Sequence, residues 1–182
     1  EILPTVFEQR GIRSQRGFTL SHVDPDEKVA YSEEGQSENF DILMATPPIR
    51  AVQAVRDSGV SRAQDGEGWL PTDHETMQVL GMKNVYVLGD TVDLPVSKAG
   101  GSCHSQSPVV VNNIASQIRF GRTCDAYDGR VVAIAQMGLD DGMPLWYDYQ
   151  HDVQPTPPNR IAGMMRKGFN RGVYWAVARG LI

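Results

Sequence analysis

The sequence has 182 residues, of which 41% are hydrophobic and 21% charged, a composition typical of a globular protein with one domain or two small ones. Its formal net charge of −5 argues against a nucleic-acid partner, because phosphate binding requires a concentrated cationic surface. No stretch approaches the ~18 consecutive apolar residues of a membrane-spanning helix, so we expect that the chain does not cross a membrane.

The first residue is Glu1 rather than Met, and no charged-then-apolar leader comes before the first predicted strand. We therefore expect an excised piece of a longer protein. The two cysteines, Cys103 and Cys124, are not part of a CxxC or Cys/His cluster. This pattern predicts no disulfide framework and no metal site, and it favours a reducing compartment.

The N-terminal region is expected to form short strands from Thr5 to Val29. Alternation from Gly17 to Val23, a turn from Asp24 to Lys28 and β-prone residues 29–31 indicate a hairpin. The apolar run from Phe40 to Thr46, stopped by two prolines, predicts a buried strand that opens into a loop. Ligands of α/β proteins bind at such strand ends.

The middle of the chain begins with weak helical character from Ala51 to Asp57 and an irregular segment from Gly66 to Asp73. Residues Asn84 to Asp90 predict a second buried strand, which ends in Gly-Asp. We expect a loop to about His104 and then a helix from Pro108 to Arg119.

Two apolar, β-prone segments, residues 130–137 and 144–149, predict a small antiparallel unit, with turn signals between them. A helical pattern resumes from Ile161 to Leu181. The charged residues of segment 159–182 are all basic and are mixed with Met, Phe, Tyr and Trp, which suits an amphipathic helix on a lipid surface. The alternative is a helix packed on its own domain or on a symmetry mate.

The most informative stretch runs from the predicted Gly89-Asp90 strand end to Gly101. Glycine allows close backbone approach, and the Asp90 carboxylate accepts hydrogen bonds from ribityl or ribose hydroxyls. Small residues at 99–101 let the chain pass over a flat ring, where the N–H groups of a helix start favour negative charge. Lys98 adds a full positive charge. An ordinary turn capped by Asp90 is the alternative reading.

The order of strand, Gly-Asp, loop, Leu94-Pro95-x-Ser97-Lys98-x-Gly100, His/Gln pair and helix resembles the FAD-contacting segment of sulfide:quinone oxidoreductases. The runs Asp41–Pro48 and Trp69–Thr72, the turn Tyr127–Gly129 and the basic C-terminal helix are also similar to this family. Related flavoproteins are flavocytochrome c sulfide dehydrogenases and type II NADH dehydrogenases. No G-x-G-x-x-G fingerprint follows a strand, so the resemblance implies that most FAD contacts come from a preceding N-terminal half.

The resemblance implies an α/β fold class, or α+β for the isolated piece. The expected architecture is an incomplete two-dinucleotide-binding-domain flavoprotein with a small antiparallel unit and a C-terminal amphipathic helix. Residues 1–50 would be the remnant of the second nucleotide-binding domain, with its hairpin and last strand. Residues 51–121 would complete the FAD domain, and residues 122–182 would form the β unit and the helical membrane and quinone side.

The implied activity is electron transfer from sulfide through FAD to a membrane quinone. The implied protein is peripheral to a membrane, on its cytoplasmic or its periplasmic face, and is a possible homo-oligomer. The residues expected to bind FAD are Gly89, Asp90, Lys98, Ala99, Gly100 and Gly101. Those expected at the quinone or membrane side are Trp146, Tyr147, Phe169 and Trp175. The expected redox residues are Cys103 and Cys124.

One departure affects the expected mechanism. Family members that oxidise sulfide often carry a redox cysteine just after the Tyr-Asp-Gly turn, where this chain reads Arg130 to Ile134. Cys103 or Cys124 is expected to substitute, with a pKa lowered by a helix N-terminus, or else both are buried structural residues. A type II NADH dehydrogenase-like enzyme, which needs no such cysteine, is the first alternative. A non-catalytic membrane-docking or interaction module is the second.

Overall fold

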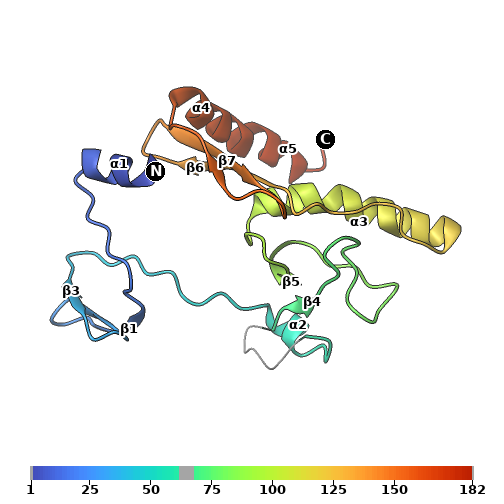
Figure 1. Ribbon diagram of the computed structural model, residues 1–182, viewed down its shortest axis with the longest axis horizontal. Coiled ribbons are helices and arrows are strands. Elements are labelled where there is room, and N and C mark those ends of the chain that lie inside the picture. The colour runs from blue at the N-terminus through green and yellow to red at the C-terminus, as the bar shows by residue number, and fades with distance from the viewer. Residues whose placement is uncertain (1, 62–67, 182) are drawn as a thin grey trace. The chain divides into compact units, whose positions relative to one another are not determined.

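The computed structural model describes residues 2–61 and 68–181 and divides into two units, residues 1–48 and 49–182 (Figure 1). Each unit has its own helices and sheets. Gly66 and Glu67, which begin the irregular segment predicted from the sequence, lie outside the described residues.

The first unit contains one helix and one antiparallel sheet of order β1-β2-β3. Its elements are α1 (Ile2–Gln9), β1 (Leu20–Asp24), β2 (Val29–Ser32) and β3 (Ser37–Asn39). The predicted hairpin is confirmed, since Val23 pairs with Ala30 across β1 and β2. Asp24 closes the turn because its Oδ1 accepts 3.0 Å hydrogen bonds from the N–H groups of Asp26 and Glu27.

Two predictions for this unit are wrong. The first part of the expected strand region is α1, in which apolar residues recur with helical spacing. The run from Phe40 to Thr46 forms no strand, and Ile42 and Met44 are 85% and 94% exposed. A strand requires a neighbour for its backbone hydrogen bonds, and among the described residues the sheet pairing ends at Asn39, followed by one bond from the Phe40 N–H to the Lys28 carbonyl.

The second unit combines a long helix, a two-stranded parallel pair, a three-stranded antiparallel sheet and a helical C-terminus. Its elements are α2 (Gln53–Arg56), β4 (Leu70–Pro71), η2 (Gly89–Thr91), β5 (Val92–Asp93), α3 (Gly100–Phe120), β6 (Val131–Gln136), β7 (Gly142–Tyr147), β8 (Gln154–Pro155), α4 (Arg160–Gly168), η3 (Phe169–Val173) and α5 (Tyr174–Val177). The weak helical character predicted from Ala51 to Asp57 is confirmed by α2, which covers the middle of that segment.

The main core of this unit lies between α3 and segments that come before and after it in the chain. Its buried members are Met77, Val79, Val87, Val92, Leu94, Val109, Val110 and Tyr127. The fully buried Asn113 joins the same region by hydrogen bonds. Its Nδ2 donates to the carbonyls of Thr76 and Asp125, and its Oδ1 accepts from the N–H groups of Cys124 and Asp125. All polar positions of this side chain are satisfied, as burial requires.

The predicted antiparallel unit is confirmed as β6 and β7, which pair from Val131↔Tyr147 to Gln136↔Gly142. Helix α4 packs against both strands, and the start of α3 packs against β6 (Figure 1). Close packing of α4 on the sheet depends on two glycines, which have no side chain. A Cβ at Gly163 would overlap the Asp140 carbonyl, and one at Gly142 would meet the backbone of α4. Glycine thus sets the distance between helix and sheet.

The segment from Asn84 to Asp90 is not the predicted strand. Tyr86 forms an isolated bridge with Gln78, Val87 is buried, and the chain then turns into the 3₁₀ helix η2. Helix α3 also begins at Gly100, inside the loop predicted to reach His104, and Pro108 lies within it. Helix propensity misses this start because Gly100, Gly101 and Ser102 are weak helix formers, whereas packing against β6 selects Gly101.

The helical C-terminus is confirmed. Helix α4 begins at Asn159, whose side chain accepts a 2.8 Å hydrogen bond from the Ala162 N–H. Around Gly168 and Gly172 the helix widens into the π-helical η3 before α5. None of the helices within residues 2–61 and 68–181 combines the length and apolarity that crossing a bilayer requires.

Candidate functional site

The Gly89-Asp90 turn lies against the first turns of α3. Gly89 is buried with φ of +76°, and its N–H donates a 2.7 Å hydrogen bond to Oε1 of Gln106. A Cβ at position 89 would come within 2.8 Å of Cys103 Sγ. Both the conformation and the close approach therefore require glycine here. Asp90, the next residue, is exposed at the surface of this turn.

Lys98 is engaged by two neighbours. Its Nζ donates a 2.6 Å hydrogen bond to the Val92 carbonyl and lies 4.3 Å from the centre of the Trp69 ring. The ammonium thus stabilises the chain just after η2 by a charge-assisted hydrogen bond and a cation–π contact.

The loop between Lys98 and α3 leaves a helix start without a side-chain cap. Ala99 is the N-cap residue, in an extended conformation, and it has no side-chain acceptor for the first N–H groups of α3. A Cβ at Gly100 would have nothing within 4 Å, so this face is open, whereas one at Gly101 would lie 2.4 Å from the Val132 carbonyl. Gly100 therefore borders open space, and Gly101 serves packing on β6.

This donor set fits the flavin expected from the sequence. The uncapped N–H groups at the start of α3 are donors at the positive end of a 21-residue helix, which suits the carbonyl and nitrogen acceptors of an isoalloxazine edge. The exposed Asp90 carboxylate is an acceptor that suits ribityl or ribose hydroxyls. The open face at Gly100 is the side on which a flat ring has room.

Cys103 lies in the first turns of α3, whereas Cys124 lies in the segment that follows this helix. Cys103 is half-buried beside Gly89, and burial, followed by the negative charge of Asp90, raises the pKa of its thiol. This direction is opposite to the lowered pKa expected from the sequence. Cys124 is exposed, and its Sγ contacts the Asn112 carbonyl at 3.7 Å. Asn112 lies about 14 Å along the helix axis from Cys103, given a rise of ~1.5 Å per residue.

The four residues expected at the quinone or membrane side are spread over the C-terminal part of the unit. Tyr147 is directed to the site loop, because its hydroxyl accepts a 2.7 Å hydrogen bond from the Ser97 N–H. Trp146 is 42% exposed on the same strand, beside His151. Phe169 packs edge-on against His104, with ring centres 5.6 Å apart. Trp175 stacks with the Arg179 guanidinium at 4.1 Å.

Several residues that support the site were not among the expected site residues, although the His/Gln pair and the Tyr-Asp-Gly turn were noted as motifs. Gln106 holds Gly89, and Tyr127 packs its ring against Tyr149 with centres 5.7 Å apart. The Tyr127 N–H and the Tyr149 hydroxyl bind the carbonyls of Glu75 and His74 and so tie a distant loop to the β unit. The Tyr-Asp-Gly motif was the available signal, since Gly129 leaves room for the Tyr149 ring.

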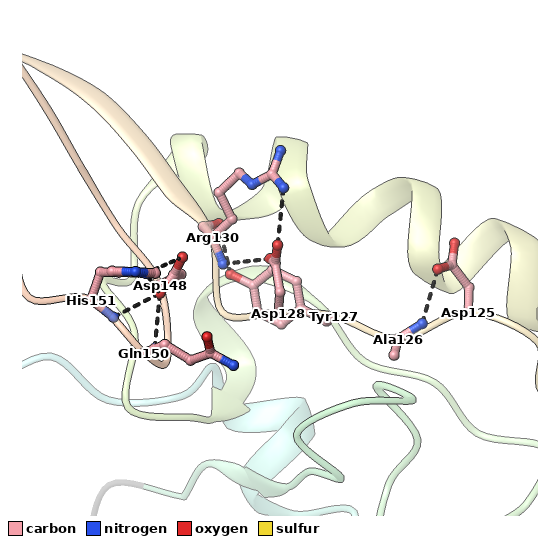
Figure 2. Close-up of polar contacts among 8 residues, drawn as sticks. All are labelled: Asp125, Ala126, Tyr127, Asp128, Arg130, Asp148, Gln150 and His151. Atoms are coloured by element: carbon pink, nitrogen blue, oxygen red, sulfur yellow. Dashed lines mark hydrogen bonds and ion pairs between the residues drawn. The ribbon is translucent and has the colours of Figure 1, made fainter.

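Two aspartates close the turns on either side of this β unit, as Figure 2 shows. Asp128 Oδ1 accepts a 2.9 Å hydrogen bond from the Arg130 N–H, and its Oδ2 pairs with the Arg130 guanidinium at 3.0 Å. Asp148 Oδ1 accepts 2.8 Å bonds from the N–H groups of Gln150 and His151. These carboxylates order loops, because their hydrogen bonds go to residues two or three positions along the chain.

A cavity of about 760 Å³ opens beside the site loop. Its lining includes Asp73, Glu75 and Asp93, with His74 as the titratable nitrogen among the lining residues. Three carboxylates disfavour the phosphates of a dinucleotide, so the cavity is a poor place for the pyrophosphate of FAD.

Comparison with known proteins agrees with the family resemblance. The chain is similar to the mitochondrial sulfide:quinone oxidoreductase of Dictyostelium discoideum, with 29% identity over 63% of this chain. It is also similar to the protein of the same name from Mus musculus, with 27% identity over 87% of this chain. The Schizosaccharomyces pombe protein of the same name is 26% identical over 76%. The resemblance to sulfide:quinone oxidoreductases is confirmed. No protein-family model matches the chain.

Solved structures confirm the fold class. The sulfide:quinone oxidoreductase of Aquifex aeolicus matches 98% of this chain and 44% of its own, with a TM-score of 0.80 and 18% identity. A chain in the mitochondrial ATP synthase structure of Tetrahymena thermophila matches 96% of this chain and 44% of its own, with a TM-score of 0.74 and 23% identity. Both are likenesses of fold.

The chain spans only part of these relatives. The matched regions cover 25%, 36% and 32% of the three sulfide:quinone oxidoreductases from Dictyostelium, mouse and fission yeast.

Proposed function

We propose that the chain is the C-terminal part of a flavoprotein oxidoreductase that passes electrons from sulfide through FAD to a membrane quinone. The observation that carries this proposal is the junction of η2 and α3, where the Asp90 carboxylate and an uncapped helix start lie on neighbouring segments. In this proposal residues 1–50 are a remnant of the second nucleotide domain, 51–121 complete the FAD domain, and 122–182 form the membrane side.

The residues of the chain bind and tune the cofactor in this proposal. FAD supplies the two-electron chemistry when it is bound. Asp90 accepts hydrogen bonds from its hydroxyls, and the N–H groups at Gly100 and Gly101 donate toward the ring edge that gains negative charge. Lys98 adds a positive charge from its position between Val92 and Trp69.

An NADH-dependent enzyme of the type II dehydrogenase kind is the second candidate. Two observations favour it: the stretch from Arg130 to Ile134 contains no cysteine, and burial raises the pKa of Cys103, which disfavours its thiolate. The names of the curated relatives favour sulfide. The electron donor therefore has to be measured.

The deciding experiment follows flavin absorbance of the full-length protein under anaerobic conditions. Sulfide is added first and a soluble quinone second, and NADH is tested in a parallel sample. Bleaching by sulfide and recovery with quinone is the expected result. Bleaching by NADH alone would move the enzyme to the dehydrogenase class, and a protein without bound flavin would overturn both candidates.

A membrane surface is proposed as the partner of the C-terminal helices. Ala162 and Gly163 face the β unit, whereas the opposite side of α4 exposes Ile161, Met164 and Met165 at 72%, 71% and 63%. The exposed aromatic residues Phe169, Tyr174 and Trp175 follow. Basic side chains flank them, so apolar groups can enter the lipid boundary while cations meet anionic headgroups.

Vesicle sedimentation tests this surface. We expect the double variant Met164→Glu/Phe169→Glu to lose binding to anionic vesicles, because both changes place charge where apolar contact is needed. Ile118→Glu is the matched control, since Ile118 is 80% exposed at the other end of the unit. Equal binding of the double variant and the wild type would exclude the surface. If light scattering without vesicles gives twice the mass of the monomer, the exposed surface would instead be assigned to contact between two copies of the protein.

A further inference from the structure

We infer that Gln106 is a positioning residue that holds the Gly89-Asp90 turn in register with the start of α3, an inference that rests on the proposed flavin site. The two parts of that site belong to separate segments, η2 and α3. Within the described residues, these two segments are joined through a side chain by the 2.7 Å hydrogen bond from the Gly89 N–H to Gln106 Oε1. It sets where Asp90 is presented.

Burial makes this bond effective. Gln106 is completely buried and Gly89 is buried as well, so water does not compete for either group. Gln106 lies in the second turn of a 21-residue helix, between the core residues Val109 and Val110 on one side and Cys103 on the other. The helix therefore acts as a rigid reference to which the turn is attached.

The amide nitrogen of Gln106, Nε2, shows that packing alone does not explain this residue. Within the described part of the chain, its buried Nε2 forms no hydrogen bond. Burial raises the pKa of Tyr127 to about 12, and an interaction of its hydroxyl with the Gln106 side chain lowers this pKa, but that contact does not have the geometry of a hydrogen bond. A buried donor without a partner is unfavourable, so packing alone would select an apolar residue at this position. The acceptor needed by Gly89 explains why a glutamine is present.

For cofactor binding, the hydrogen bond of Gln106 fixes the position of the Asp90 carboxylate relative to the start of α3. Asp90 follows Gly89 directly, and a turn released from Gln106 would let the carboxylate move relative to the N–H groups of Gly100 and Gly101. Misplacement of one contact lowers affinity without removing any group that touches the cofactor. Gln106 thus acts on FAD through Asp90.

The test uses the full-length protein and two readouts, the hydrogen-exchange rate of the Gly89 amide and the Kd for FAD. We expect Gln106→Met, which keeps the length of the side chain but lacks the acceptor, to accelerate exchange at Gly89 and to raise the Kd about tenfold, as loss of one ordinary hydrogen bond does. Gln106→Glu keeps an acceptor oxygen and is expected to restore both values.

Two controls separate positioning from general destabilisation. Val110→Ala removes core packing one turn further along α3, and we expect it to lower stability while Gly89 exchange and the Kd stay within about twofold of wild type. In an Asp90→Asn background, Gln106→Met should add less than about threefold to the Kd, because the two residues act in series. A tenfold effect in both backgrounds, or a wild-type Kd in Gln106→Met, would overturn the inference. A wild-type protein that binds no FAD would instead overturn the proposed function.

Discussion

The ammonium of Lys98 lies over the ring of Trp69, 4.3 Å from its centre, while it donates to the Val92 carbonyl at 2.6 Å. Lys98 therefore has a structural role beside the cofactor role expected from the sequence. We expect Lys98→Met to lower the free energy of unfolding by about 2 kcal/mol, since a charge-assisted hydrogen bond and a cation–π contact are lost. Urea denaturation measures this change.

Lys83→Met is the matched control, because Lys83 is exposed, and its expected effect is within about 0.5 kcal/mol. A double-mutant cycle with Trp69→Leu should give a coupling of roughly 0.5–1 kcal/mol. No coupling would mean that the ring contributes packing alone.

The buried Asn113 is expected to be far more important for stability than its neighbour. Asn113→Ala leaves two carbonyls and two N–H groups without their partner, and we expect a loss of roughly 3–5 kcal/mol. Asn112→Ala removes one exposed hydrogen bond to Asp125, with an expected loss below about 1 kcal/mol. The denaturation midpoints of the two variants measure these losses of stability. Equal losses in Asn113→Ala and Asn112→Ala would contradict the structural role of Asn113.

The reactivity of Cys103 reports on its surroundings. Burial and then the charge of Asp90 raise the pKa of its thiol, so we expect slow alkylation by iodoacetamide at neutral pH and a midpoint above that of a free cysteine. In a Cys124→Ser background, Asp90→Asn should move this midpoint to lower pH, because it removes a negative charge. Rapid alkylation of the wild-type thiol at pH 7 would instead support a redox role.

Asp73 should make stability depend on pH in the acid range. The Thr76 N–H, whose hydrogen bond is the largest cause, lowers the pKa of this carboxyl in the folded protein. A lowered folded pKa contributes stability above the unfolded pKa of ~3.9, and this stability is lost as pH falls below about 4. Denaturation between pH 3 and 6 measures it. Asp73→Asn keeps the acceptor oxygen, so its disadvantage relative to wild type should shrink toward pH 3, and a constant difference would contradict the assignment.

The candidate site was predictable in part because its chemistry is local. Gly89-Asp90 and the small residues before α3 are recognisable as a short motif, and the structure places them on adjoining segments. Gln106 was not selected as a site residue, since its bond to Gly89 joins positions 17 residues apart. The direction of the Cys103 pKa was missed for the same reason. Burial depends on the neighbours of the folded chain, and a helix start by itself predicts the opposite.

The sequence by itself determined the elements whose hydrogen bonds lie close along the chain. The hairpin around Asp24, the pairing of β6 with β7 and the helical C-terminus begun by Asn159 are of this kind. Only the tertiary structure decided the segments that depend on distant partners. Beyond Phe40, the run to Thr46 pairs with no strand of the described residues and stays irregular. Contact with the Val132 carbonyl, in contrast, allows α3 to begin at glycines that helix propensity disfavours. The local sequence pattern sets the secondary-structure propensity of a segment, and the partners available in the folded chain determine whether that structure forms.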